Sequence, residues 1–334
     1  MKRRVFCILT VLCLALSACA PAAPAESEPA QVQSISFTDD LDRTVTVEPP
    51  RRVAALIGSF ADIWQLAGGG DTLVAAADDA WTSFDLNLGQ DVIQLGGVKQ
   101  INLEQLAAAQ PDLVLASSNT AAQLDLLPAL EQLGLNVAYF KVTEFQDYLH
   151  MLDLCSQLTG DTERFDQYGL AVESQVQAAR DRADGSAPTV LYIRATGAGC
   201  KVKNSRDSVL GEMLRDLGCV NIADGDDSLL EQLSLERILQ LDPEFIFVVM
   251  QGADKTGAQQ ALDQTLLASP AWQSLTAVRQ GRYYVMDDRL YNLKPNARWG
   301  EAYERLADIL YPDAAQNAAD AAASGGADRS GGAA

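Results

Sequence analysis

Histidine is scarce in this sequence, and zinc-binding cysteine motifs are missing from it. Its 334 residues include a single histidine, His150, and six cysteines, none of them in a Cys-x-x-Cys arrangement. A structural zinc site needs a cluster of Cys or His ligands, and the Gly-x-Ser-x-Gly motif of α/β-hydrolases is missing as well. One histidine also leaves few options for general-base catalysis. These absences argue against a structural zinc site and give no support to an enzyme.

Positive charge is also scarce, with 25 Lys and Arg against 45 Asp and Glu and a net charge of −20. General nucleic-acid binding requires a basic face, and electrostatic attachment to anionic lipid requires basic clusters. Neither is expected here. The acidic balance by itself mainly favours solubility.

The longest apolar run lies at the N-terminus and is short. Residues 2–4 are basic and residues 5–16 are apolar, too few to span a bilayer, so residues 1–18 are predicted to be a signal peptide. The run ends Leu16-Ser17-Ala18-Cys19, which resembles the lipobox of bacterial lipoproteins. There the cysteine is diacylated, with palmitate among its fatty acids, and becomes the new N-terminus; two chains anchor a protein firmly. A plain secretory signal with an incidental Cys19 is the alternative.

Two low-complexity segments flank the body of the protein. Residues 19–34 contain prolines among Ala, Ser and Glu and predict a flexible tether, and residues 312–334 predict a disordered tail. We therefore expect a lipid-anchored protein on the extracellular face of the cytoplasmic membrane.

Three thiols remain beyond Cys19. Buried free thiols are the default, and a disulfide between Cys200 and Cys219 stays open.

Strand and helix patterns alternate between the tether and the tail. Residues 35–47 alternate as in a β-hairpin, and several short apolar runs rich in β-branched residues follow, each before a helical pattern. Such alternation predicts an α/β fold with mostly parallel sheets covered on both faces. The expected strands are Arg52–Ile57, Thr72–Ala77, Asp112–Ala116, Val137–Phe140, Val190–Arg194, Phe245–Met250 and Tyr283–Met286.

An internal repeat divides this α/β region in two. The segment from Asn102 to Leu115 matches the segment from Ser234 to Phe247 without a gap, at a constant offset of 132 residues. Each copy reads as a helix N-cap, an exposed Glu, an apolar helix face, a proline turn and a buried strand. Two lobes of one design are therefore predicted, over residues 35–158 and 187–311.

The segment between the lobes, residues 159–186, predicts a helix that connects them. Asp161 is a suitable N-cap, apolar or aromatic residues recur at helical spacing from Phe165 to Val176, and residues 184–188 end the pattern. About twenty residues at 1.5 Å each span roughly 30 Å. An ordinary surface helix fits the stripe equally well, but the matched lobes on either side favour a strut.

Taken together, residues 35–311 resemble the extracellular solute-binding lipoproteins of ABC importers for chelated iron and vitamin B12 (class III periplasmic binding proteins). The resemblance rests on the opening hairpin, on Arg52-Val53, on the two repeated segments, and on two stretches in the second lobe, Gly218-Cys219-Val220-Asn221-Ile222 and Pro270-Ala271-Trp272 followed by 277–282. It implies two Rossmann-like lobes joined by a single long helix, with a ligand cleft between them and no catalytic activity. It also implies a monomer that works with a permease dimer and its cytoplasmic ATPase.

The same resemblance gives a role to two glutamates. Glu104 and Glu236 occupy equivalent positions in the repeated segments, and in the family such carboxylates engage arginines on the two permease subunits. Two acidic residues at equivalent positions on related lobes suit a permease made of two symmetry-related subunits. The alternative is that each is a first-turn Glu favoured by the helix dipole.

Charge distribution suggests an anionic ligand. Residues 35–142 hold five Lys and Arg, and residues 187–311 hold thirteen. Cations in predicted loops after strands of the second lobe, with aromatics after strands of either lobe, form the candidate ligand-binding set. Each fits a solvated surface charge or a core aromatic equally well. The set is Phe60, Trp81, Arg194, Lys201, Lys203, Arg206, Arg289 and Tyr291.

A ferric siderophore, already chelated and often anionic, fits this set best. Cobalamin is the other serious candidate, and haem stays open through Tyr291 or Met250. Bare zinc or manganese is disfavoured because such sites need several His and carboxylate ligands. We expect no cofactor of the protein's own. A ligand-sensing receptor and an extracellular enzyme on this scaffold are the less favoured classes.

Overall fold

The computed structural model describes residues 34–206 and 208–312. The predicted signal peptide, Cys19, almost all of the tether and nearly the whole predicted tail lie outside these residues. Within the described part, none of the helices is both long and apolar enough to cross a membrane.

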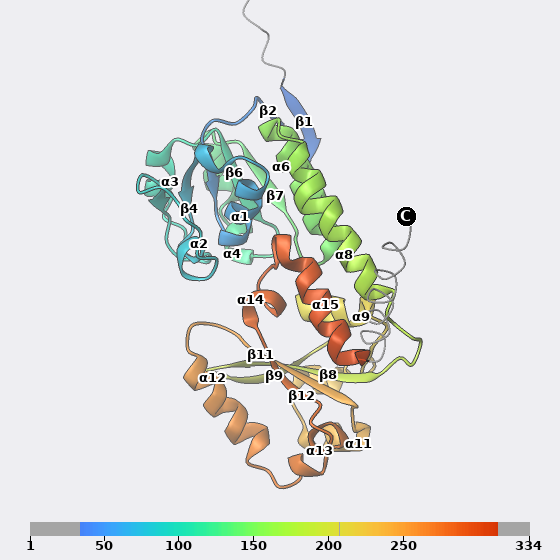
Figure 1. The fold of residues 1–334 in the computed structure, drawn as a ribbon. Coiled ribbons are helices and arrows are strands. Elements are labelled where there is room, and N and C mark those ends of the chain that lie inside the picture. The colour runs from blue at the N-terminus through green and yellow to red at the C-terminus, as the bar shows by residue number, and fades with distance from the viewer. Residues whose placement is uncertain (1–33, 207, 313–334) are drawn as a thin grey trace, which may run out of the picture. The chain divides into compact units, whose positions relative to one another are not determined.

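The first lobe is built on a five-stranded parallel sheet of order β5-β4-β3-β6-β7 (Figure 1). The predicted hairpin before it is confirmed, with β1 (Ile35–Thr38) antiparallel to β2 (Thr44–Val47). The sheet strands are β3 (Val53–Ala55), β4 (Leu73–Ala76), β5 (Ile93–Gln94), β6 (Leu113–Ser117) and β7 (Val137–Phe140). The helices are α1 (Gly58–Leu66), α2 (Asp79–Thr82), α3 (Leu103–Ala109), α4 (Ala121–Leu124), α5 (Leu127–Gln132) and α6 (Phe145–Thr159).

The buried carboxylate of Asp39 joins the hairpin to this sheet. Its Oδ1 accepts from the N–H groups of Leu41 and Arg43, both at 3.0 Å. Its Oδ2 accepts from the Arg43 guanidinium at 2.6 Å and from the N–H of Tyr139 on β7 at 3.1 Å. Burial alone would raise the pKa of Asp39, but these hydrogen bonds outweigh burial and lower that pKa.

Replacing Asp39 by asparagine should therefore cost stability in a pH-dependent way. At pH 7 we expect a loss of about 2 kcal/mol, because the charge-assisted bonds to Arg43 disappear. The wild-type advantage is complete above the unfolded-state pKa of about 3.9 and is lost as the pH falls through the lowered native pKa. Urea unfolding of both proteins at pH 7 and pH 3 measures the difference, with the exposed Asp42→Asn as control. A difference that does not shrink at pH 3 would contradict the assignment.

The second lobe repeats the topology of the first. Its parallel strands have the order β10-β8-β11-β12, which places β8 where β3 lies, and β10, β11 and β12 where β4, β6 and β7 lie. The strands are β8 (Thr189–Thr196), β9 (Gly199–Lys203), β10 (Val220–Asn221), β11 (Phe245–Met250) and β12 (Tyr283–Met286). The helices are α9 (Val209–Asp216), α10 (Asp227–Glu231), α11 (Leu235–Leu241), α12 (Lys255–Leu262), α13 (Thr276–Arg279), α14 (Asp288–Tyr291) and α15 (Trp299–Leu310).

The repeated segments adopt matching local structures. In the first copy, Asn102 caps α3 by accepting from the N–H groups of Glu104 and Gln105. In the second copy, Ser234 caps α11 by accepting from the N–H of Arg237. The predicted N-caps are therefore confirmed.

The repeat extends to the hydrogen bonds at the starts of β3 and β8. The carboxylate of Asp112 accepts from the N–H groups of Arg51 and Arg52, just before β3. The carboxylate of Glu244, which is 132 positions later, accepts from the N–H of Thr189 at the start of β8 at 2.8 Å. A contact conserved between the copies supports the prediction that both lobes share one design.

The connection between the lobes is helical but is not one regular helix. It consists of α7 (Glu163–Phe165), a π-helical turn (Asp166–Leu170) and α8 (Ala171–Arg180). The predicted N-cap is wrong, because Thr162 occupies that position and the Asp161 carboxylate pairs with Arg164 instead. As Figure 1 shows, α8 packs along α15.

One hydrophobic core runs through this connection into both lobes. Val172 and Val176 of α8 are buried in a cluster that includes Val53 of the first sheet and Val190 of the second. The stripe predicted from helical spacing is therefore a packing surface. Each sheet has a second, separate apolar cluster on its other face.

Candidate ligand-binding site

A cavity of about 490 Å³ lies between the two lobes. The first lobe lines it with Asp79, Thr82, Ser83 and Val98. The second lobe lines it with Gln251, Gly252, Ala253, Lys255, Asp288, Arg289, Asn292 and Leu293. Several of these residues follow strands β4 and β11 directly. Ligands of open α/β sheets bind beyond the carboxyl ends of the strands. We call this space the interlobe cavity.

A second cavity of about 490 Å³ lies beside the β8–β9 hairpin. Its lining is Arg194, Thr196, Ala198, Gly199, Cys200, Lys201, Lys203 and Gln251. Gln251 also lines the interlobe cavity, so the two spaces adjoin. We call this one the hairpin cavity.

A third cavity, beside Ser34 and Asp112, lies at the amino ends of the first-lobe strands. Ligands of such sheets bind at the opposite edge, beyond the carboxyl ends of the strands.

Cations in the interlobe cavity already have partners. Arg289 lies 3.5 Å from the Asp62 carboxylate, donates to the Lys294 carbonyl at 2.9 Å and covers the ring of Phe84 at 3.9 Å. Burial raises the pKa of Asp62 and lowers the pKa of Arg289. Lys255 pairs with Asp288. The positive charge of this cavity is therefore largely neutralised by the protein itself.

Cations in the hairpin cavity are arranged differently. Arg194 on β8 stands directly opposite Lys201 on β9, so two like charges share one face of the hairpin, which is unfavourable without an anion. The Arg194 Nε is buried and has no hydrogen-bond partner within the described part of the chain, while its Nη2 lies 3.3 Å from the Tyr192 hydroxyl. Among residues 34–206 and 208–312, no ion pair joins Arg194 or Lys201 to a carboxylate.

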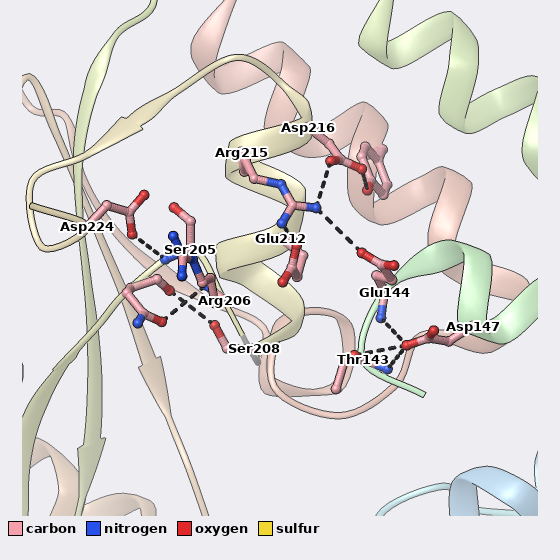
Figure 2. Close-up of polar contacts among 12 residues, drawn as sticks. Thr143, Glu144, Asp147, Ser205, Arg206, Ser208, Glu212, Arg215, Asp216 and Asp224 are labelled. Atoms are coloured by element: carbon pink, nitrogen blue, oxygen red, sulfur yellow. Dashed lines mark hydrogen bonds and ion pairs between the residues drawn. The ribbon is translucent and has the colours of Figure 1, made fainter. Parts of the chain in front are cut away.

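Two polar bridges also join the lobes. In Figure 2, Arg215 of α9 contacts Glu212, Asp216 and, across the lobe boundary, Glu144 at 3.4 Å. Glu144 is the N-cap of α6 and forms a capping box with Asp147. The second bridge is made by the Asn296 side-chain amide of the second lobe, which donates to the Ser59 carbonyl and to the Asp62 carboxylate of the first lobe.

Comparison with known proteins identifies this arrangement. A family model described as periplasmic binding protein matches residues 53–290. The chain belongs to this family. It is similar to a putative ABC transporter substrate-binding lipoprotein, YhfQ of Bacillus subtilis, at 23% identity over 87% of this chain and 93% of the relative. It is also similar to a vitamin B12-binding protein of Vibrio vulnificus, at 22% identity over 78% of this chain and 90% of the relative.

Solved structures share the fold of this periplasmic binding protein. The haem-binding protein RhuT from Roseiflexus sp. RS-1 superposes with a TM-score of 0.65 at 21% identity, covering 79% of this chain and 99% of that one. SirA of Staphylococcus aureus, complexed with staphyloferrin B, has a TM-score of 0.64 at 20% identity, with coverage of 83% and 97%. These structures show the fold, and the family match makes this chain a member of a family of substrate-binding proteins rather than of enzymes.

The aromatic residues predicted to stack on a ligand are misplaced for that role. Phe60 is fully buried and packs edge-to-face on Phe140. Tyr291 is only 2% exposed, and its hydroxyl donates to the Ala302 carbonyl at 3.0 Å. Phe60 lies in the buried first turn of α1, and Tyr291 is the buried last residue of α14, so both rings point into the core. Trp81 is half-buried against the core and lines neither cavity.

The predicted cations of the binding protein divide into three groups. Arg194, Lys201 and Lys203 line the hairpin cavity, although the two lysines lie on strand β9 and not in the predicted loop. Arg289 lines the interlobe cavity but already contacts Asp62. Arg206 is exposed and lines neither cavity; its N–H donates to Asn204. The sequence prediction missed Asp79 and Gln251, although both closely follow strands.

The predicted docking glutamates of the binding protein have matching positions. Glu104 and Glu236 are exposed and occupy the first turns of α3 and α11. His150 is exposed on α6, as expected for a surface residue. Cys155, Cys200 and Cys219 are free thiols, so the alternative disulfide is absent among the described cysteines; the predicted burial holds for Cys155, whereas Cys200 and Cys219 are half-buried.

Proposed function

We propose that this protein is the lipid-anchored substrate-binding component of an ABC importer that captures a ferric siderophore. In this proposal Cys19 carries the lipid, and the body of the protein lies on the extracellular face of the cytoplasmic membrane. Glu104 and Glu236 dock on the two permease subunits. The ligand occupies the two adjoining cavities.

The observation that carries the proposal is a pair of cations in the hairpin cavity that no carboxylate of the described residues pairs with. Arg194 and Lys201 face each other across β8 and β9 in a protein of net charge −20. A buried guanidinium nitrogen without a partner is costly, and an anionic ligand would supply the missing acceptor. A ferric chelate with anionic groups meets this requirement, and a bare cation does not.

Fluorescence titration tests the proposal. Trp81 is half-buried and belongs to the α2 helix that contributes Asp79 and Thr82 to the interlobe cavity. The purified protein would be titrated with ferric siderophores of several chemical classes, haemin, cyanocobalamin and zinc chloride. We expect saturable binding of at least one ferric siderophore, tighter than that of the other three. Preferential binding of haemin, cyanocobalamin or zinc would contradict the proposal.

A further inference from the structure

The two cavities lack aromatic side chains. Among the described residues that line them, none is Phe, Tyr or Trp. Phe84, which follows the lining residue Ser83, is covered by the Arg289 guanidinium, and Trp81 packs against the core. Planar ligands such as porphyrins, corrins and catechol rings gain affinity by stacking on aromatic faces. These cavities offer no such face.

The lining instead offers hydroxyl, amide and charged groups, and the charged groups of the interlobe cavity include the carboxylates of Asp79 and Asp288. Hydroxyls come from Thr82, Ser83 and Thr196, and amides from Gln251 and Asn292. A ligand with many oxygen atoms and little apolar surface matches this chemistry, because each buried polar group needs a hydrogen-bond partner.

The two cavities differ in how far their cations are paired with carboxylates. In the interlobe cavity Arg289 and Lys255 are balanced by Asp62 and Asp288. In the hairpin cavity the guanidinium of Arg194 keeps a buried, unpartnered Nε. A carboxylate is the acceptor that fits a guanidinium best, since it can take two parallel hydrogen bonds. The anionic end of the ligand is therefore expected at the hairpin, and its neutral, oxygen-rich part between the lobes.

We infer that the ligand is a ferric chelate built from aliphatic α-hydroxycarboxylates, with a carboxylate held by Arg194 and Lys201. Such a molecule binds iron through hard oxygen atoms and carries anionic groups and hydroxyls but no aromatic ring. Gln251, which lines both cavities, lies where the two ends of the ligand join. This inference rests on the proposed function and names the chelate class.

The test compares chelates on the purified full-length protein and three variants. The probes are ferric citrate with citrate in excess, a ferric tris-catecholate and a neutral ferric trihydroxamate. We expect ferric citrate to bind most tightly. Arg194→Gln and Lys201→Gln should each raise its Kd about tenfold, because each removes one charge-assisted contact. Arg206→Gln removes an equal charge outside both cavities and should leave the Kd within about twofold.

The outcomes separate this inference from the proposed function. Tighter binding of the tris-catecholate or the trihydroxamate than of ferric citrate would overturn the inference and leave the proposed function standing. An unchanged Kd in both Arg194→Gln and Lys201→Gln, with circular dichroism and melting temperature as in the wild type, would also overturn it. Failure of every ferric chelate to bind would overturn the proposed function itself.

Discussion

Replacing Glu104 and Glu236 together by alanine should abolish ligand import and leave ligand binding in solution unchanged. The two carboxylates occupy equivalent positions at the starts of α3 and α11, and both are exposed. Because the lobes repeat one design, the two charges are offered by related surfaces, which suits a receiver made of two permease subunits. Loss of one interfacial charge pair typically costs several kcal/mol when it is desolvated (about 2–5). Loss of both should reduce uptake to the background level.

Uptake of radiolabelled ferric chelate by cells carrying each variant measures this effect. Single substitutions should give intermediate uptake. The matched control is Glu163→Ala with Glu304→Ala, which changes the net charge equally at exposed sites outside α3 and α11. Fluorescence titration of the purified variants checks that binding is intact. If the Glu104/Glu236 double variant transported as well as the control, the docking role would be wrong.

Replacing Asn296 by alanine should destabilise the protein by about 4 kcal/mol. Asn296 is fully buried, and its amide donates to the Ser59 carbonyl at 2.9 Å and to the Asp62 carboxylate at 2.8 Å. Alanine would leave both acceptors buried without this donor, at about 1–3 kcal/mol each. Its backbone φ of 54° also lies in the left-handed region, which asparagine tolerates better than alanine.

A glycine at position 296 separates the contribution of the lost hydrogen bonds from that of the backbone strain. Asn296→Gly loses the same hydrogen bonds but fits the backbone angle without strain, so it should be about 1 kcal/mol more stable than Asn296→Ala. Urea unfolding at pH 7 gives both values. Equal stability of the two variants would show that the backbone angle contributes nothing. A loss below about 1 kcal/mol in both would mean that the bridge to Ser59 and Asp62 is unimportant.

Local and repeated features were predictable from the sequence. The buried strands are continuous apolar runs, and the caps of α3 and α11 follow from Asn102 and Ser234, so the parallel sheets and the two matched lobes could be inferred. The start of α5 also has a local signal, because Pro128 lies in its first turn, where the missing N–H and fixed φ of proline suit a helix start.

Features set by distant contacts were not predictable. Phe60 and Tyr291 follow strands as a ligand-stacking residue would, but the packing of α1 and α14 turns their rings inward. The alternation from Gly199 to Lys203 is short and cationic, and only pairing with β8 makes it a strand. Asn296 contacts residues more than 230 positions earlier in the chain. No local pattern encodes such a contact.

The core shared by the lobes also bears on how the chain is made. Val45 near the N-terminus and Trp299 on the last helix belong to the same buried cluster, and Trp299 packs against Phe145 with ring centroids 5.9 Å apart. The cluster stays incomplete until α15 has been synthesised, so most of the chain emerges from the ribosome before its core can close. If the chain is exported as proposed, late closure of this core keeps it unfolded while it passes through a translocation channel.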